Sequence, residues 1–237
     1  MKIPILKKDN VLLKDSLETG FLVLVNKPAG WTSFDVCRKI RNIVHIKKVG
    51  HAGTLDPFAT GLMILGVGKG TKTMSDFLQS SKVYDAVIQF GFSTDTYDIT
   101  GQKIAEKSEF ILEQDLLCRH IKSTIGAYDQ IPPMYSAKKV NGKALYKYAR
   151  NGIEVERKPV TVQIFDVNLK SWEKPLLNLR MHVSKGTYIR SYAHDLGESL
   201  KVPAVLKELK RIAIGDMKIE ESFTIEEFIE FWKKIAA

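Results

Sequence analysis

One aspartate stands in a loop whose composition suits it to chemistry. Asp56 is followed by Pro57, which biases the aspartate away from helix and restrains the chain after it. Three glycines in the segment 50–61 permit tight turns and the close approach of another molecule, and His51 lies in the same segment. A carboxylate held on a rigid loop can act as a nucleophile or as a general base. The alternative is an Asx turn without chemistry, because Asp-Pro turns are common.

Other kinds of chemical site are disfavoured by residue spacing. Cys37 and Cys118 do not form a C-x-x-C pair, and the five histidines have no zinc-ligand spacing. The glycine-rich segment 66–72 matches neither the phosphate-loop pattern nor the dinucleotide-binding pattern. We therefore expect no metal site and no nucleotide-binding role for that segment.

A second chemical feature is the stretch 129–152, which is rich in basic and aromatic side chains. Its cations Lys138, Lys139, Lys143, Lys147 and Arg150 are interleaved with Tyr135, Tyr146 and Tyr148. Cationic side chains among aromatic rings suit single-stranded or looped RNA, because they bind phosphates while the rings stack on bases. The alternative is a solvated helix with its tyrosines turned partly inward.

The composition of the whole chain favours a polyanionic partner. The 237 residues include 36 lysines and arginines against 27 acidic residues, a formal net charge of +9. Neutralising phosphates releases counterions, so this excess favours nucleic acid, although a basic protein that binds nothing anionic has the same count. No apolar run approaches the roughly 20 residues needed to span a bilayer, and residues 1–15 lack the apolar core of a secretory signal. The expected location is the cytoplasm, with no membrane partner.

The elements around Asp56 are predicted from hydrophobic periodicity. An apolar run over 21–25 predicts a strand that ends at a Lys-Pro-Ala-Gly turn, and helical spacing predicts a helix over 34–45 with Ser33 as its N-cap. The run 62–67 predicts a strand directly after the aspartate loop, and 71–79 a helix. Alternation over 82–92 predicts a strand whose buried face carries Tyr84, Ala86, Ile88, Phe90 and Phe92.

The second half of the chain mixes strands and helices irregularly. Helices are expected over 109–124, 188–200, 203–209 and 225–235, the last with a capping box formed by Thr224 and Glu227. Strands are expected over 160–169 and 176–184, while residues 1–20 form a leader without a pattern. Because there is no regular βαβ rhythm, the sequence predicts an α+β fold with a largely antiparallel sheet.

Several motifs together resemble one known family. The segment 50–61, Gly-His-Ala-Gly-Thr-Leu-Asp-Pro-Phe-Ala-Thr-Gly, resembles the signature of the TruB family of tRNA pseudouridine synthases. Further blocks resemble the family at 27–33, at Lys82-x-Tyr84 with 94–101, at 132–150, and at 184–190 with 195–197. The resemblance covers roughly residues 21–215. It implies the pseudouridine synthase fold, a central largely antiparallel mixed sheet flanked by helices and loops, with a thumb-like RNA-binding insertion at about 129–152.

The resemblance also implies a reaction and a partner. Uridine 55 in the T-loop of tRNA is isomerised: the N1–C1′ bond breaks, the flipped-out base rotates, and a C5–C1′ bond forms. Asp56 aligns with the catalytic aspartate, and the choice between nucleophilic attack on C1′ and removal of the 2′ proton stays open. The partner is the tRNA T-arm. No cofactor, no metal and no obligatory protein partner is implied.

The remaining site residues follow from the same motifs. Arg190 aligns with an arginine that pairs with the aspartate, and Tyr84 with the ring that stacks on the target base. His51 resembles the histidine that fills the gap left by the flipped nucleotide or contacts its backbone, and Tyr188 and Leu209 resemble walls of the pocket. RNA contacts are expected from the basic residues of the motifs, namely Lys27, Lys82, Lys138, Lys139, Lys143 and Arg150.

The domain organisation is expected to be a leader, 1–20, and one catalytic domain, 21–237, without the C-terminal PUA domain of many family members. One competing interpretation is the RNA-guided relative that modifies ribosomal RNA. A second is an RNA-binding protein or RNA chaperone that acts on the T-arm without essential catalysis. A third, a carboxylate glycosidase, requires a second catalytic acid, which neither Asp95 nor Asp98 clearly supplies.

Overall fold

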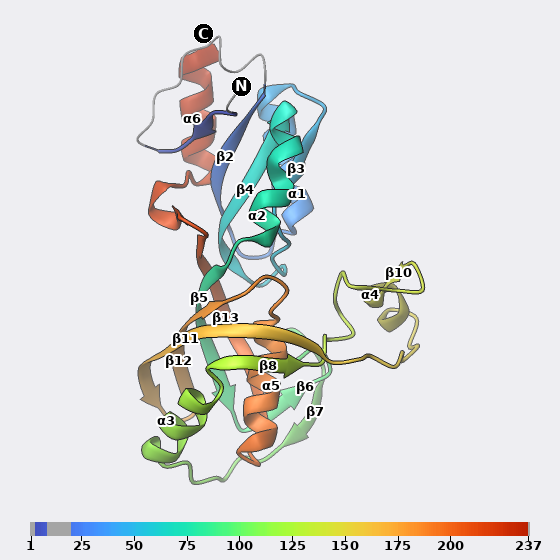
Figure 1. Ribbon diagram of the computed structural model, residues 1–237, viewed down its shortest axis with the longest axis vertical. Coiled ribbons are helices and arrows are strands. Elements are labelled where there is room, and N and C mark those ends of the chain that lie inside the picture. Colours follow the sequence, from blue (N-terminus) through green and yellow to red (C-terminus); the bar gives the residue numbers. More distant parts are fainter. Residues whose placement is uncertain (1–2, 9–19, 237) are drawn as a thin grey trace. The chain divides into compact units, whose positions relative to one another are not determined.

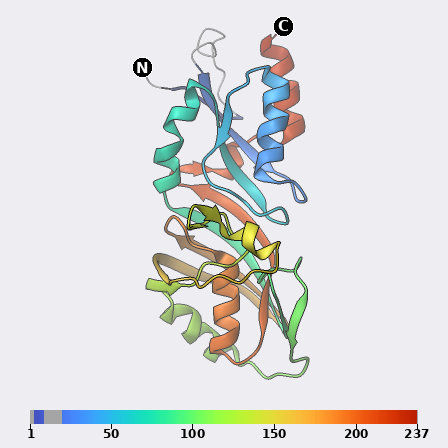
Figure 2. The same ribbon diagram turned by 90° about the vertical axis from the view of Figure 1, so that its right-hand side faces the viewer.

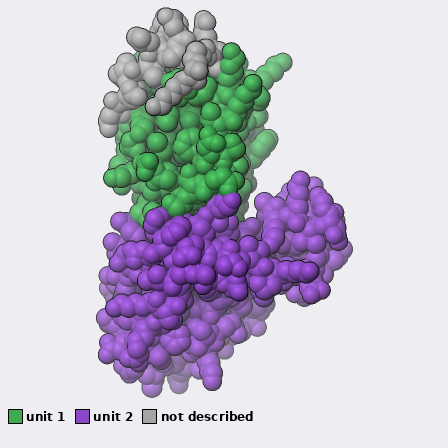
Figure 3. Space-filling view, viewed as in Figure 1, with its two compact units in different colours: residues 1–84, 210–237 green, residues 85–209 purple. Residues whose placement is uncertain are grey.

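The computed structural model describes residues 3–8 and 20–236. The chain divides into two compact units (Figure 3). Unit 1 combines the two ends of the chain, Met1–Tyr84 and Lys210–Ala237, and unit 2 is the continuous segment Asp85–Leu209. Strands β5 (Lys82–Phe90) and β13 (Ala204–Ile214) each contribute residues to both units.

Unit 1 contains a group of strands covered by helices. Its elements are β1 (Ile5–Leu6), β2 (Gly20–Lys27), α1 (Ser33–Val44), β3 (Val49–His51), β4 (Thr60–Gly68), a 3-10 turn η2 (Lys69–Thr73), α2 (Met74–Gln79), β14 (Met217–Lys218), a second 3-10 turn η3 (Ile219–Glu221) and α6 (Ile225–Ala236). β2 and β4 pair antiparallel from Gly20↔Gly68 to Lys27↔Gly61, and β4 pairs parallel with β13 at Lys210↔Thr60 and Arg211↔Gly61. Helices α1 and α6 lie side by side (Figure 2).

Burial explains why these strands are continuous apolar runs. β2 and β4 are buried on both faces over most of their length, which is the pattern of a central strand covered on two sides. Leu22, Leu24, Leu62, Ile64 and Ile214 belong to one buried cluster. The aspartate loop therefore ends on a rigid strand rather than on another loop.

Unit 2 contains the remaining strands, flanked by helices α3 and α5 (Figures 1 and 2). Besides its parts of β5 and β13, its elements are β6 (Phe92–Thr94), β7 (Lys103–Glu106), α3 (Gln114–Ser123), β8 (Gly126–Gln130), β9 (Lys139–Val140), β10 (Lys143–Ala144), α4 (Leu145–Ala149), β11 (Val160–Glu173), β12 (Leu176–Val183) and α5 (Ile189–Ser199). β11 pairs antiparallel with both β12 and β8.

The predicted fold class is confirmed. Eight strands of the described chain follow one another in the main sheet in the order β1-β2-β4-β13-β5-β12-β11-β8, with β3 also paired to β4 and β14 to β13. The sheet is mixed, because β1–β2 and β4–β13 are parallel while the other pairs with a defined register are antiparallel. None of the helices in the described residues is both long enough and apolar enough to cross a membrane.

Two local predictions are wrong. The helix expected over 203–209 is the first half of strand β13. Its apolar residues match helical spacing, but Ala204, Val205 and Leu206 are consecutive and all buried, as in a strand covered on both faces.

The N-cap of α1 is Thr32, not Ser33: the Thr32 hydroxyl accepts from the Asp35 amide and the Asp35 carboxylate accepts from the Thr32 amide.

Other element predictions agree with the structure. The Thr224–Glu227 capping box is present, with hydrogen bonds of 2.9 and 3.2 Å. The buried face of β5 carries Tyr84, Ala86, Ile88 and Phe90, whereas Phe92 follows Gly91 into β6 and is half-buried. Within the leader 1–20, residues 5–6 form β1 and Gly20 begins β2, while residues 9–19 lie outside the described part of the chain.

Candidate active site

Asp56 is half-buried in the loop between β3 and β4, and the backbone around it is held by hydrogen bonds. The Ser33 hydroxyl accepts from the Leu55 amide at 2.9 Å and donates to the Leu55 carbonyl at 3.1 Å. The Gly30 amide donates to the Pro57 carbonyl, and the Ala59 amide donates to the carbonyl of Asp56 itself. Ser33 at the start of α1 therefore fixes the residue before the aspartate, which is a different role from the N-cap expected of it.

A buried lysine holds the other side of the same loop. Lys27 is fully buried, and its ammonium donates to the carbonyls of Pro28, Trp31 and Pro57 at 2.9, 2.7 and 3.2 Å. Burial lowers the pKa of Lys27 to about 8, the negative charge of Asp56 opposes this shift, and the positive charge of Arg211 adds to it. The Lys27 ammonium thus interacts electrostatically with Asp56, while RNA contact by this residue stays a prediction.

His51 is the last residue of β3 and enters the aspartate loop half-buried. Its Nδ1 is buried and has no hydrogen-bond partner among the described residues. Burial lowers the pKa of His51, and the nearby charge of Arg211 lowers it further. Both effects favour the neutral imidazole, which leaves a flat, uncharged ring beside the loop.

The two candidate residues of β5 are both buried. Tyr84 is 8% exposed and is the last residue of unit 1. The Lys82 ammonium donates to the carbonyls of Phe77, Leu78 and Ser80, at the C-terminal end of α2. These bonds stabilise the end of that helix, where free carbonyls attract a cation. Contact of Lys82 with RNA stays a prediction.

In unit 2 the structure places Arg190 in the first turn of α5, with an exposed fraction of 3%. Its guanidinium donates to the carbonyls of Thr96 and Tyr135 at 3.0 and 2.9 Å, and Nη1 lies 3.4 Å from Oδ2 of Asp98. Asp98 is itself buried and accepts three hydrogen bonds at Oδ1, from the Thr96 hydroxyl and from the amide and hydroxyl of Thr100. The orientation of Arg190 is therefore defined within its own unit.

The two predicted pocket walls also belong to unit 2. Tyr188 is half-buried just before α5, and the Gln130 side chain binds both its backbone amide and its carbonyl, at 2.7 and 2.9 Å. Leu209 is 8% exposed on β13 and is the last residue of the unit. Leu209 is thus a strand residue, not the helix residue that its spacing suggested.

The basic segment 129–152 makes an excursion between β8 and β11 that carries the β9–β10 hairpin and α4 (Figure 1). Lys139 and Arg150 are exposed, while Lys138 and Lys143 are half-exposed. The Lys143 ammonium lies 4.5 Å from the centre of the Tyr148 ring, and the Arg150 guanidinium 5.4 Å from that of Tyr146. Cations and rings therefore alternate on this segment in space as well as in sequence.

The predicted residues divide between the units. Unit 1 brings together Asp56, His51 and Lys27, whereas Arg190, Tyr188, Leu209 and the basic segment belong to unit 2. The pairing of Asp56 with Arg190 joins the two units and stays a prediction. Sequence reasoning missed Arg211, whose charge acts on both Lys27 and His51. In the sequence Arg211 is the second of two adjacent charged residues before the apolar residues 212–214, which does not single it out.

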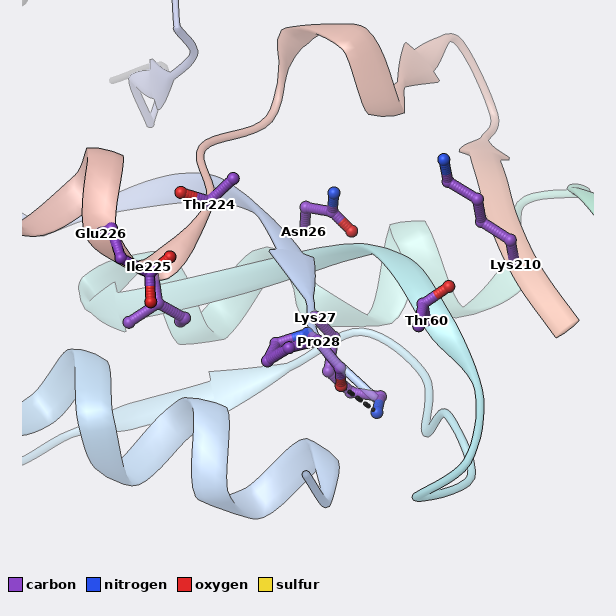
Figure 4. Close-up of a pocket in the computed structure, with 8 residues that line it drawn as sticks. All are labelled: Asn26, Lys27, Pro28, Thr60, Lys210, Thr224, Ile225 and Glu226. Carbon is purple, nitrogen blue, oxygen red and sulfur yellow. Dashed lines mark hydrogen bonds between the residues drawn. The ribbon is translucent and has the colours of Figure 1, made fainter. Parts of the chain in front are cut away.

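A surface hollow of about 340 Å³ lies elsewhere in unit 1 (Figure 4). It is lined by Asn26, Lys27, Pro28, Thr60, Lys210, Thr224, Ile225 and Glu226. The Lys27 ammonium turns away from it toward the Pro28 carbonyl. Of the predicted site residues only Lys27 lines this hollow, together with Thr60 from the end of the segment 50–61, while Asp56 and His51 are not among its lining residues.

Comparison with known proteins agrees with the sequence motifs. The family model described as "TruB family pseudouridylate synthase (N terminal domain)" matches residues 41–189. Two curated relatives are named tRNA pseudouridine synthase B. That of Ureaplasma urealyticum is 42% identical over 216 residues, covering 90% of this chain and 94% of the relative. That of Chlamydia abortus is 45% identical over 210 residues, covering 88% of each.

A solved structure supports the fold as well. The structure titled "Crystal Structure of a Cbf5-Nop10-Gar1 Complex" contains a chain with a TM-score of 0.73 to this one and 26% sequence identity. The similar region covers 92% of this chain but 57% of that chain. This chain therefore spans little more than half the length of the solved relative.

Proposed function

We infer the function of this chain from the premise that it belongs to the TruB family of pseudouridylate synthases. It is an enzyme, a tRNA pseudouridine synthase, as are the curated relatives by name. Its substrate position is uridine 55 in the T-loop, and the base is flipped out of the loop before it reacts. The observation that carries the proposal is the aspartate loop, whose sequence matches the family signature and whose backbone is held by Ser33 and Lys27.

Asp56 is the catalytic residue in this proposal. The N1–C1′ bond of the nucleotide breaks, the detached uracil rotates, C5 bonds to C1′, the proton on C5 leaves, and N1 ends with a proton in place of its bond to the sugar, so the product is an isomer of the substrate. An ionised carboxylate can begin this sequence by attacking C1′ or by removing the 2′ proton. The positive charge of Lys27 near Asp56 supports the ionised form. The reaction is an isomerisation without net oxidation or reduction, and the proposal assigns no cofactor to it.

The other residues bind and orient the nucleotide. Arg190, already fixed by Asp98 and two carbonyls, pairs with the Asp56 carboxylate when the site is complete. Tyr84 stacks on the flipped base, Tyr188 and Leu209 line the pocket, and the neutral His51 ring fills the gap in the RNA stack. The basic segment 129–152 covers the T-arm, because its exposed cations and rings suit looped RNA.

The substrate indicates the cellular location of the enzyme. tRNA is processed in the cytoplasm, so we place the enzyme there, acting without an obligatory protein partner. The likeness to a chain of a multiprotein complex favours the alternative of an enzyme that needs partners. Turnover of free tRNA by this chain alone distinguishes the two.

The decisive experiment measures tritium release from tRNA labelled at C5 of uridine, because C5 must lose its hydrogen when it bonds to the sugar. Wild type and Asp56→Ala are compared, with Asp76→Ala as the matched control for loss of an acidic side chain in the same unit. We expect release by wild type and Asp76→Ala, and no release by Asp56→Ala although it still binds tRNA. Tight tRNA binding by wild type without release would contradict the proposal and favour the chaperone.

A further inference from the structure

Arg211 of β13 is 1% exposed and reaches both ends of the aspartate loop. Its Nε donates to the Leu62 carbonyl at 2.7 Å, and its Nη2 donates to the Gly53 carbonyl at 3.2 Å. Gly53 lies three residues before Asp56 and Leu62 six residues after it. One guanidinium therefore joins the start and the end of the segment that carries the carboxylate.

The backbone of Arg211 fits against the same loop. Arg211 is opposite Gly61 in the parallel pairing of β13 with β4. Gly61 has a φ of +111°, and a Cβ atom built there would lie 2.3 Å from the Arg211 carbonyl oxygen. A side chain at Gly61 would thus force the two strands apart, so the sequence keeps the backbone of Arg211 in direct contact with the end of the loop.

The side chain is held by carbonyl groups alone. No ion pair of Arg211 with a carboxylate occurs among the residues that the structure describes. Its charge disfavours protonation of its neighbours, since it lowers the pKa of both Lys27 and His51. A buried cation in this position costs stability that an apolar side chain of similar size would avoid. Its geometry offers a compensating use, because the donors of the planar guanidinium are spread over three nitrogens in fixed directions, and Nε and Nη2 here reach two separate carbonyls, whereas an ammonium donates from a single nitrogen.

We propose that Arg211 is a positioning residue for Asp56, which ties the two ends of the aspartate loop together and so sets the place of the carboxylate. It does not touch the substrate. The proposal rests on the proposed function in one respect, that Asp56 performs the chemistry. Since a displacement of about 1 Å can cost on the order of a hundredfold in rate, loosening this loop acts on turnover rather than on binding.

The test compares Arg211→Met, Arg211→Lys and Arg211→Ala with wild type and with Lys210→Met, the exposed neighbour on the same strand. Single-turnover tritium release at saturating tRNA gives the rate of the chemical step, and filter binding gives the Kd for tRNA. We expect the rate to fall at least about tenfold in all three Arg211 variants, with Kd within about threefold of wild type. Lys210→Met is expected to keep both values.

Chemical rescue separates positioning from simple loss of folding. Added guanidinium at low millimolar concentration is expected to restore part of the rate of Arg211→Ala, because it can occupy the space left between the Gly53 and Leu62 carbonyls. It is not expected to restore Asp56→Ala. The proposal is overturned if folded Arg211→Lys and Arg211→Met turn over at the wild-type rate, or if their defect lies in Kd alone. Failure of the proposed function is a different result, because wild type itself would then release no tritium.

Discussion

The backbone carbonyls of the aspartate loop accept hydrogen bonds from three buried side chains that come from different parts of the sequence. Ser33 binds at Leu55, Lys27 at Pro57, and Arg211 at both Gly53 and Leu62. Each contact is made to backbone, so the loop conformation depends on these side chains more than on the side chains of the loop itself. Substitutions at these positions are expected to act through the geometry of Asp56.

Lys27 gives a pH-dependent prediction at this scale. Its pKa is about 8 in the folded protein, against 10.5 for an ordinary lysine. Between these two values the unfolded chain holds a proton that the folded chain has released, so the contribution of Lys27 to stability rises with pH, by up to about 1.4 kcal/mol per pH unit. Below the folded value both states are protonated and this contribution is constant.

The measurement is the free energy of unfolding in urea for wild type and Lys27→Met across the pH range from 7 to 10. The difference between the two proteins is expected to grow in favour of wild type above pH 8, because other groups titrate alike in both. Lys72→Met, which removes an exposed ammonium in the same unit, serves as the control. A pH-independent difference for Lys27→Met would show that the ammonium keeps an ordinary pKa.

At the scale of elements, hydrophobic periodicity predicts the type of a helix or strand when one of its faces is buried and the other is exposed. The alternation of apolar residues in β5 and their helical spacing in α1 and α6 predicted these elements, because each of them has one buried face. The strand β13 was misread because its first three residues, Ala204, Val205 and Leu206, are all buried, which removes at that point the alternation that distinguishes strand from helix. Arg211 was missed for a different reason: its contacts are made with residues about 150 positions earlier, which no local pattern records.

The basic segment 129–152 gives a prediction about mobility. Its regular elements are short, two residues in each of β9 and β10 and five in α4, so few of their amides are protected by long hydrogen-bond ladders. Its base at 130–136 is instead bound to the start of α5 through Gln130, Ser191 and Arg190. We expect fast hydrogen exchange over 137–150 in the free protein and slower exchange when tRNA binds.

Hydrogen exchange with mass spectrometry on Asp56→Ala provides the measurement, since this variant is expected to hold tRNA without turning it over. Peptides from β12, which is buried on alternate positions, serve as the internal reference. If saturating tRNA leaves exchange over 137–150 unchanged, this segment does not cover the RNA. A change in exchange confined to the base of the segment, 130–136, would likewise mean that residues 137–150 do not cover the RNA.

At the scale of the whole molecule, we expect the affinity for tRNA and the rate of the chemical step to respond differently to salt. The net charge of +9 acts on every RNA phosphate that the protein approaches, whereas the proposed bond changes involve the single half-buried carboxylate of Asp56. With about 0.7 released counterions per phosphate, neutralisation by Lys138, Lys139, Lys143 and Arg150 gives a slope of roughly −3 for log affinity against log salt.

Steady-state kinetics between 50 and 200 mM KCl test this separation. KM is expected to rise well over tenfold while kcat changes by less than about twofold. The double variant Lys138→Ala with Lys139→Ala is expected to reduce the slope by about 1.4, and Lys233→Ala with Lys234→Ala on α6 is the charge-matched control. A kcat that falls in step with affinity would mean that the cations also act on the chemical step.

The discontinuity of unit 1 has a consequence for biosynthesis. A ribosome delivers residues 85–209 as an unbroken stretch, so unit 2 can begin to fold while the chain is still growing. Unit 1 must wait for residues 210–237, because β4 gains its parallel neighbour and the aspartate loop gains Arg211 only when β13 has emerged. The nascent protein thus possesses its basic segment before the aspartate loop gains its hydrogen bonds to Arg211.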